Sequence, residues 1–401
     1  MDKGVFEKYN FIVNEQNGDI FPATDFYFYP LQVKDYAEYF RQCDLESYPL
    51  MAFVYLTNKC SDDCVGCFAK AIEDGSESLD FDILKKLLID LSANGTKAVK
   101  FAGREPTMYP YLSECLLLCE ELGLKTLVIT SGSNIDRHRE SLMSSCSHLR
   151  VSLNTSTYEL HEKFHRPSSN ALKFPDRVSE LKCILAERRA RNLVSGATFL
   201  IREENNDALE YASLCKHIGF DYVRYTLVDE KKHHLLNGWR NTYHKLLALN
   251  SSNFSVTFHE DLPNDYFSTN CSTNGKDCLL DPAIISRVTI HANGKVNSCH
   301  EGWRACWPED NMATYGNINV AGFNEIWLSE KRSKFVQYVI ETLKDKSCGT
   351  IEQDACNGIK CNERCKYTSF NMIQRWIINQ VNINNNAKIV GINIEREWGI
   401  S

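Results

Sequence analysis

The sequence has no run that approaches the ~18 consecutive apolar residues of a membrane-spanning helix. Its start, MDKGVFEKYN, lacks the apolar core of a secretory signal, so we expect a cytoplasmic protein with no membrane partner. Long blocks of like charge are also absent: 45 Lys and Arg against 52 Asp and Glu leave a net charge of -7. We therefore expect no nucleic-acid partner. A hydrophobic content of 43% and a charged content of 24% indicate an ordinary globular protein.

The 401 residues are enough for two or three domains of about 150 residues each. From residue 50 to about 230, short β-branched or aromatic runs alternate with segments of helical apolar spacing, which predicts six βα units on a parallel sheet. Such units form either an open doubly wound sheet or an incomplete barrel. The predicted strands are 53–57, 98–102, 126–130, 149–153, 197–201 and 222–227, and the clearest helices are 81–93, 111–122 and 207–217.

The alternation is lost after about residue 235, where cysteines become frequent and Asn-Gly turns separate short segments. This change predicts a second domain whose fold depends on bound metal. The predicted divisions are an N-terminal extension (1–49), the parallel α/β domain (50–235), a linker (236–265), a Cys-rich domain (266–370) and a tail (371–401).

Cysteine is unusually frequent, with 17 residues, and many thiolates in a reducing compartment usually indicate metal. Three of them form a tight cluster directly after the first predicted strand: Cys60, Cys64 and Cys67. Eight more lie in the last third of the chain: Cys271, Cys278, Cys299, Cys306, Cys348, Cys356, Cys361 and Cys365. We expect the other six to be small core residues, as isolated cysteines usually are: Cys43, Cys115, Cys119, Cys146, Cys183 and Cys215.

The first cluster has the spacing Cys60-x3-Cys64-x2-Cys67 and should lie at the carboxyl end of the sheet, because it follows a parallel strand. No His is close to it in the sequence, so a tetrahedral zinc site cannot close locally. Three thiolates can instead hold three irons of a [4Fe-4S] cluster and leave one iron open to a substrate or cofactor.

With this motif the chain resembles the radical S-adenosylmethionine (radical SAM) superfamily, whose fold is a partial (β/α)6 TIM-like barrel. The second strand ends in Gly103-Arg104-Glu105-Pro106, similar to the family's Gly-Gly-Glu-Pro, so Gly103 and Glu105 are implied to hold the methionine ammonium of SAM. Arg104 and Gly66 depart from the family pattern. Further SAM contacts are implied for Ser152, Asn154 and Asn205, although Ser and Asn at strand ends also serve ordinary turn chemistry.

Residues 278–299 resemble the opening of a SPASM domain, which carries auxiliary Fe-S clusters, with Gly294 in the hairpin turn before Cys299. The resemblance implies a first auxiliary cluster on Cys271, Cys278, Cys299 and Cys365. A second would use Cys348, Cys356 and Cys361, and we favour Cys306 as its fourth ligand. An open iron or the absence of a second cluster are alternatives, and a four-thiolate zinc site would satisfy the same pattern.

The function implied by the resemblance is reductive cleavage of SAM to a 5′-deoxyadenosyl radical, which abstracts hydrogen from a substrate. The electron would come from a reductant such as flavodoxin or ferredoxin. Relatives with SPASM domains mostly modify peptides, so a peptide or protein side chain is the favoured substrate. The alternatives are an oxidoreductase or epimerase acting on a small biosynthetic molecule such as a sugar or nucleoside, and a non-catalytic zinc-binding interaction protein.

Overall fold

A computed structural model describes most of the chain between residues 46 and 345. The described residues are 11–13, 20–22, 31, 35, 38–39, 46–67, 75–187, 193–227, 239–251, 253–258, 286–298 and 313–345. The eight cysteines of the last third and the predicted tail lie outside these ranges. Within the described ranges, no helix is both long and apolar enough to cross a membrane.

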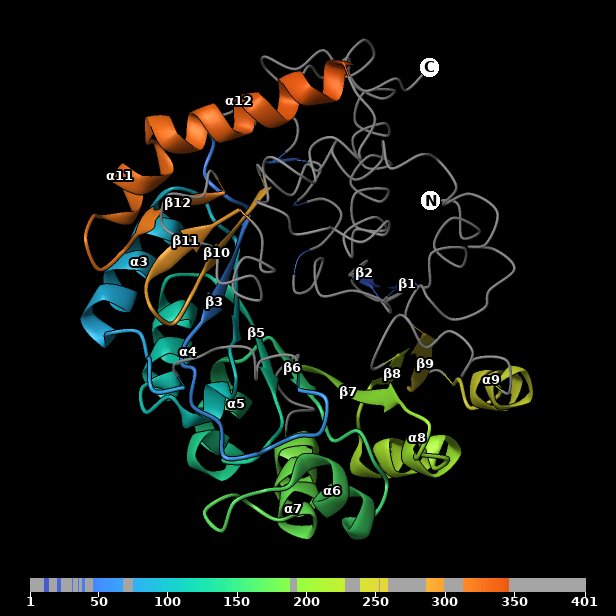
Figure 1. The fold of residues 1–401 in the computed structure, drawn as a ribbon. Coiled ribbons are helices and arrows are strands. Elements are labelled where there is room, and N and C mark those ends of the chain that lie inside the picture. The colour runs from blue at the N-terminus through green and yellow to red at the C-terminus, as the bar shows by residue number, and fades with distance from the viewer. Residues whose placement is uncertain are drawn as a thin grey trace.

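One ten-stranded sheet organises the fold, in the order β12-β11-β10-β3-β4-β5-β6-β7-β8-β9 (Figure 1). All neighbours from β10 through β9 pair in parallel. The strands of this sheet are β3 (Met51–Tyr55), β4 (Ala98–Ala102), β5 (Lys125–Thr130), β6 (His148–Val151), β7 (Val194–Ile201), β8 (Tyr222–Leu227), β9 (Ser255–Phe258), β10 (Arg287–Ile290), β11 (Lys295–Asn297) and β12 (Thr314–Asn317). A separate antiparallel pair consists of β1 (Phe11–Val13) and β2 (Ile20–Pro22).

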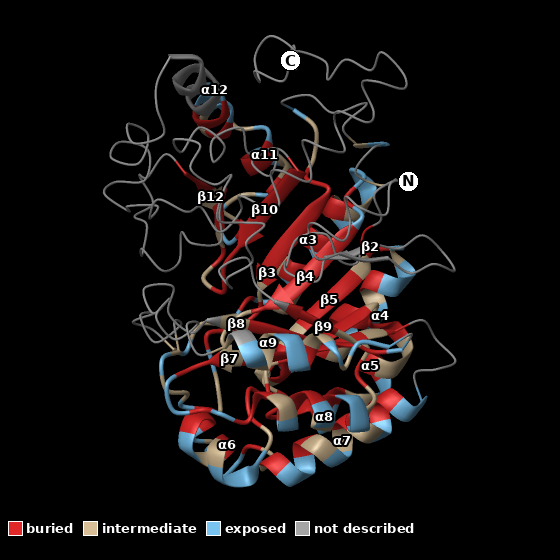
Figure 2. Cartoon of the chain, turned by 90° about the vertical axis from the view of Figure 1, so that its right-hand side faces the viewer, coloured by how far each residue is buried: buried red, intermediate tan, exposed pale blue. Residues whose placement is uncertain are grey.

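Helices connect the parallel strands and cover one face of the sheet, so that the strands lie buried beneath helices whose outer sides are exposed (Figure 2). The α-helices are α3 (Phe81–Ala93), α4 (Leu112–Glu121), α5 (Arg139–Ser145), α6 (Tyr158–His165), α7 (Phe174–Glu187), α8 (Ala208–Ile218), α9 (Arg240–Leu247), α11 (Phe323–Trp327) and α12 (Glu330–Asp345). Two short 3-10 helices, η2 (Pro106–Met108) and η3 (Ile135–His138), follow β4 and β5. The predicted α/β class with a partial (β/α)6 barrel, formed by β3 to β8, is confirmed.

Helix α3 shows how the sequence specifies these elements. Asp80 caps its start by accepting a hydrogen bond from the Ile83 amide at 3.0 Å. The chain leaves the helix at Asn94 and Gly95, where Gly95 takes φ +90°. The helix packs its apolar face on the sheet through four buried leucines at helical spacing: Leu84, Leu87, Leu88 and Leu91.

Parallel pairing continues on both sides of the six predicted strands. Within the predicted linker 236–265, the structure places α9 and β9, and β9 pairs with β8. Strand β10, from the predicted Cys-rich domain, pairs with β3, and Ile290 lies opposite Val54. The described part of that domain therefore shares the sheet and the core of the barrel.

The hairpin between β10 and β11 turns at Asn293-Gly294, as the sequence predicts. Gly294 takes φ +84°, and a Cβ there would lie 2.4 Å from the Asn317 Oδ1 atom. Only glycine accommodates both the left-handed backbone and this close approach. The turn thus joins β10 to β11, which in turn pairs with β12. Cys299 lies outside the described residues.

Candidate active site

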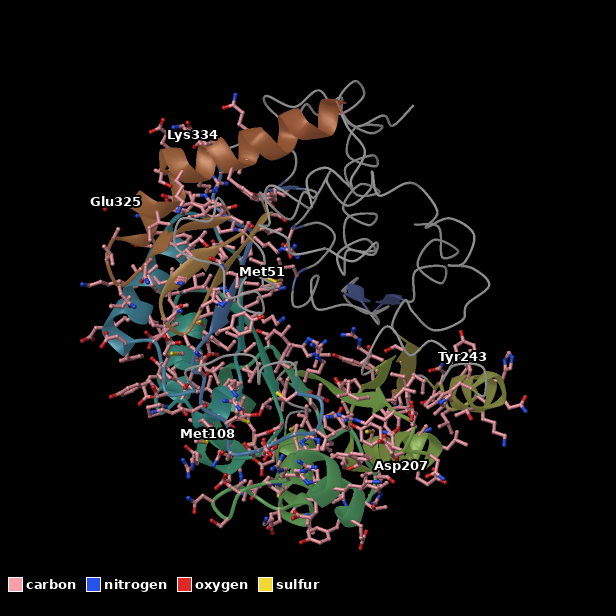
Figure 3. All side chains as sticks on the ribbon, in the orientation of Figure 1. Met51, Met108, Asp207, Tyr243, Glu325 and Lys334 are labelled. Atoms are coloured by element: carbon pink, nitrogen blue, oxygen red, sulfur yellow. The ribbon has the colours of Figure 1, made fainter. Side chains whose placement is uncertain are left out.

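The carboxyl ends of the parallel strands gather at one edge of the sheet. Figure 3 shows Met108, which follows β4, and Asp207, which follows β7, toward the lower end of the molecule, whereas Met51, at the start of β3, lies higher. Cys60, Cys64 and Cys67 lie in the loop that leaves β3 at this same edge. The structure therefore places the predicted cluster motif where parallel α/β folds carry their chemistry.

The three thiols are free and half-buried. Burial is the largest cause that raises the pKa of Cys60 to about 12, and burial also raises the pKa of Cys64. The charges of Cys60 and Cys67 oppose ionisation of Cys64, and a bound metal cation would offset this repulsion. The Asp62 amide also donates a hydrogen bond to Cys60 Sγ at 3.4 Å. This donor set fits a thiolate-bound Fe-S cluster with one open iron.

Gly66, which departs from the family pattern before the third cysteine, takes φ +70°. An apolar side chain at this backbone conformation would be strained, so glycine here follows from the course of the loop. The Cys67 amide then donates a hydrogen bond to the Cys64 carbonyl at 3.3 Å. The departure at Gly66 is therefore compatible with a loop that brings the three thiols together.

The turn after β4 approaches the start of the cysteine loop. Gly103 takes φ +140°, and a Cβ at this position would lie 2.7 Å from the Thr57 carbonyl oxygen. The Arg104 amide donates to that carbonyl, and the Glu105 amide donates to the Lys59 carbonyl, each at 3.1 Å. The backbone at Gly103 to Glu105 is thereby fixed beside the loop of the first cysteine.

Gly103→Ala is expected to destabilise the protein by roughly 1–3 kcal/mol and to weaken SAM binding, because the turn must shift away from Thr57. The control is Gly123→Ala, at a position that also has a positive φ (+70°) but has no atom within 4 Å of a Cβ built there. Calorimetric titration of each anaerobic variant with SAM measures the difference in SAM affinity between them. Equal SAM affinities of the two variants would contradict the role of this close approach.

The Glu105 carboxylate is fully buried and accepts five hydrogen bonds. Thr107 donates through its amide (3.0 Å) and hydroxyl (2.6 Å), and the Thr130 hydroxyl donates at 2.5 Å, all to Oε1. Ser131 donates to Oε2 through its amide (2.7 Å) and hydroxyl (2.8 Å). Glu105 therefore ties the end of β4 to the end of β5, and this geometry favours the backbone of residues 103–105 as the part of the motif that meets SAM.

The other SAM contacts implied by the resemblance differ in their surroundings. Asn205 is buried, and both polar atoms of its side chain hold the turn after β7, through the Arg202 amide (2.9 Å) and the Leu200 carbonyl (2.8 Å). This arrangement favours turn chemistry over cofactor contact. Ser152 is half-buried at the end of β6, and its carbonyl accepts from Asn154 Nδ2 at 3.3 Å. Asn154 takes φ +62° and keeps a buried Oδ1 without a hydrogen-bond partner among the described residues.

A buried network beside Cys64 escaped sequence reasoning. Arg177 of α7 and Asp62 are both fully buried, and the guanidinium donates to both carboxylate oxygens at 2.8 and 2.6 Å. His165, the last residue of α6, brings Nδ1 to 3.5 Å from Cys64 Sγ. No His is close to the cysteine cluster in the sequence, but α6 brings His165 close to it in space. Asp62, Cys64 and His165 form a group of possible metal ligands within 4.8 Å of one another.

The remaining cysteines divide by exposure. Cys115, Cys119, Cys146 and Cys215 are buried, as expected, but Cys183 on α7 is exposed and is not a core residue. Helix α7 turns this position outward, while Leu181 and Ile184 face the core. Cys43 and all eight cysteines assigned to auxiliary clusters lie outside the described residues: Cys271, Cys278, Cys299, Cys306, Cys348, Cys356, Cys361 and Cys365.

Two family matches accord with this site. Residues 54–222 match the radical SAM superfamily, and residues 278–365 match an iron-sulfur cluster-binding domain, SPASM. These matches assign residues 54–222 to the radical SAM superfamily and residues 278–365 to a SPASM domain. The cofactors of the chain are accordingly [4Fe-4S] clusters and SAM.

Individual relatives match shorter segments. A Methanosarcina barkeri Fe-coproporphyrin III synthase is 32% identical over 112 residues, 27% of this chain and 28% of that protein. A Flammeovirga pacifica S-adenosylmethionine-dependent nucleotide dehydratase is 33% identical over 88 residues, 21% of this chain and 30% of that protein. A Rhodopseudomonas palustris PqqA peptide cyclase is 32% identical over 107 residues, 26% of this chain and 28% of that protein. The matches therefore span less than a third of each relative.

Among solved structures, Streptococcus suis SuiB bound to its precursor peptide SuiA has a similar fold, with a TM-score of 0.53. The alignment covers 72% of this chain and 66% of SuiB, at 18% sequence identity. At this identity the likeness concerns the fold.

Proposed function

We propose that this chain is an enzyme that cleaves SAM reductively and uses the resulting radical to modify a side chain of a peptide or protein. The observation that carries the proposal is the thiol group of Cys60, Cys64 and Cys67 at the carboxyl edge of the sheet, beside the glycine turn of Gly103. When bound, a [4Fe-4S] cluster supplies the electron that splits SAM into methionine and a 5′-deoxyadenosyl radical.

The residues around the thiols hold and orient the reactants. The three thiolates would hold three irons, and the backbone of residues 103–105 would receive the methionine ammonium while Glu105 keeps that turn in place. Arg202 places a positive charge beside Cys64. The charge of Arg177 is paired with Asp62, and the charge of Arg104 beside Cys60 is opposed by Glu105 and Asp62. Cations beside a cluster stabilise its reduced form. A small electron-transfer protein such as flavodoxin or ferredoxin would supply the electron.

The substrate class rests on the SPASM domain and on the named relatives. The PqqA peptide cyclase acts on a peptide by its name, which supports a peptide substrate here. The nucleotide dehydratase and the porphyrin synthase support a small molecule as the second candidate. The eight C-terminal cysteines would hold one or two auxiliary clusters that accept an electron from the substrate radical or position the substrate.

The proposal predicts that anaerobically purified protein is brown, absorbs broadly near 400 nm and carries about 8 to 12 irons per chain. With dithionite and SAM it should produce 5′-deoxyadenosine and methionine, measured by liquid chromatography and mass spectrometry. A colourless protein with stoichiometric zinc and no iron would support the zinc-binding alternative.

The substrate class is tested by hydrogen transfer. Extracts of cells grown in deuterium oxide are separated into peptide and small-molecule fractions, and each is incubated with the enzyme, SAM and dithionite. We expect deuterium in 5′-deoxyadenosine only with the peptide fraction. Deuterium transfer from the small-molecule fraction alone would contradict a peptide substrate while preserving the radical chemistry.

A further inference from the structure

His165 lies opposite Cys64 because backbone hydrogen bonds join the residues on either side of Cys64 to the residues on either side of His165. The Val65 amide donates to the Phe164 carbonyl at 2.8 Å, and the Asp63 amide donates to the Arg166 carbonyl at 3.2 Å. Asp62 also forms a β-bridge with Pro167. These backbone contacts fix the two segments against each other, so the approach of His165 to Cys64 is set by the fold.

The ring of His165 is held in one plane by packing. His161, one helical turn earlier, stacks on it with a centroid distance of 4.3 Å and an interplanar angle of 4°. Phe174 packs against His161 from α7 at 5.1 Å. His161 is fully buried, and burial is the largest cause that lowers its pKa to about 2, so this neighbouring ring is neutral.

The hydrogen bonds of Asn154 define which nitrogen of His165 carries the proton. Asn154 Nδ2 lies 3.3 Å from the Ser152 carbonyl, which can only accept, so this atom is the amide nitrogen and donates. The same Nδ2 lies 3.2 Å from His165 Nε2. Because Nε2 accepts there, the ring carries its proton on Nδ1.

His165 Nδ1 lies 3.5 Å from Cys64 Sγ and 3.4 Å from Asp62 Oδ2, so its one proton is shared between the sulfur and the carboxylate. Asp62 already receives two hydrogen bonds from Arg177. A mononuclear metal on Asp62, Cys64 and His165 would have to displace that guanidinium, which has no exposed surface. The geometry therefore favours a hydrogen bond from His165 to the sulfur over a metal bond through it.

We propose that His165 is a positioning residue for the SAM-cleaving cluster: its Nδ1–H donates a hydrogen bond to the Cys64 thiolate and raises the reduction potential of the cluster. This inference rests on the proposed role of Cys64 as a cluster ligand. Reduction places more negative charge on the cluster sulfurs, and a hydrogen bond to a cysteine sulfur stabilises that form. Asn154 holds the other end of the same ring, which connects a residue of the implied SAM site to the cluster.

The test is a redox titration of the anaerobic, iron-loaded enzyme followed by electron paramagnetic resonance. The SAM-cleaving cluster is identified as the signal that changes when SAM is added. His165→Phe preserves a planar ring but has no donor, and we expect an about tenfold lower ratio of reduced to oxidised cluster at a fixed solution potential, equivalent to ~59 mV for one electron. Iron content should stay at the wild-type value.

Two further variants separate the hydrogen bond from packing. His165→Asn places an amide near the Nδ1 position and should restore the ratio to within about threefold of wild type. His161→Phe keeps the stacked ring and has no contact with Cys64, so it should leave the potential unchanged. An unchanged potential in His165→Phe, with a SAM-responsive signal present, overturns the role of His165 and leaves the proposed function intact. The absence of any SAM-responsive signal in the wild type contradicts the proposed function, and one zinc per chain that is lost in His165→Phe would indicate the mononuclear site instead.

Discussion

Replacing Cys60, Cys64 and Cys67 together by Ala is expected to remove about four irons per chain and to abolish 5′-deoxyadenosine production. The three thiols lie in the loop that leaves β3, whereas the buried thiols in the described part of the chain lie in the packed core and Cys183 lies exposed on α7. No described thiol can therefore replace them. Iron analysis and single-turnover assays with dithionite and SAM measure the two effects.

The matched controls are single cysteine variants outside this loop. Cys183→Ala, at an exposed position on α7, should leave iron, activity and stability unchanged. Cys115→Ala, fully buried on α4, should keep iron and activity but lose about 1 kcal/mol of stability through the small cavity left behind. If the triple variant still produced 5′-deoxyadenosine at the wild-type rate, the assignment of the cluster ligands would be wrong.

Local patterns in the sequence predicted the parts of the fold that local interactions determine. The helix predicted for 81–93 coincides with α3, because its cap, its leucine spacing and its Asn94-Gly95 end all lie within the segment. The predicted strand 222–227 coincides with β8. Strands β5 and β7 begin one and three residues earlier than predicted, whereas β3 and β6 are shifted toward the N-terminus and end two residues earlier than predicted. In β7 the sheet extends pairing into a residue without strong β propensity, Gly196, which lies opposite Tyr222.

Strands β9 and β10 show where the sequence pattern was insufficient. Each is four residues long. Strand β10 is stabilised by pairing with β3, which is distant in the sequence, and β9 by pairing with β8, from which an irregular segment separates it. Their partners, β8 and β3, are the outer strands of the six predicted ones. An edge strand of a parallel sheet offers unpaired backbone groups, and the structure satisfies them with segments that have no periodic signal of their own.

The candidate site also combines residues that a local sequence pattern reveals with residues that only the fold brings together. The spacing of Cys60, Cys64 and Cys67 is local, so the motif was visible in the sequence. The five donors around Glu105 come from Thr107 in η2 and from Thr130 and Ser131 at the end of β5, and only the structure brings these two segments together. The approach of His165 to Cys64 depends on how α6 docks on the cysteine loop, which no spacing in the sequence encodes.

The second large effect is expected for Arg177→Met, which should lower the free energy of unfolding by about 3–5 kcal/mol. Burial raises the pKa of the Asp62 carboxyl, but hydrogen bonds from His165 and Arg177 outweigh it and hold the pKa well below its ordinary value. Asp62 is therefore charged in the folded protein. Removing the guanidinium leaves this carboxylate buried beside the cysteine loop without its main partner.

The loss extends beyond the ion pair, because Arg177 also donates to the Ser131 carbonyl at 3.0 Å and to the Leu172 carbonyl at 2.8 Å. It thus connects the loops after β3 and β5 to α7. Urea unfolding of the iron-loaded protein, monitored by tryptophan fluorescence, measures the change, and loss of iron at lower urea concentration should accompany it.

The matched control is the Arg139–Glu180 pair, which joins α5 to α7 and has an Arg139 side chain exposed at 42%. Water already solvates those charges, so Glu180→Gln should leave the unfolding midpoint unchanged. Arg177→Lys should recover only part of the lost stability. The planar guanidinium donates to both oxygens of Asp62 at once, and an ammonium cannot reproduce this geometry. If Arg177→Met unfolded at the same urea concentration as Glu180→Gln, the buried pair would not hold the cysteine loop in place, and the orientation of Cys64 toward His165 would have to depend on the backbone contacts with α6 alone.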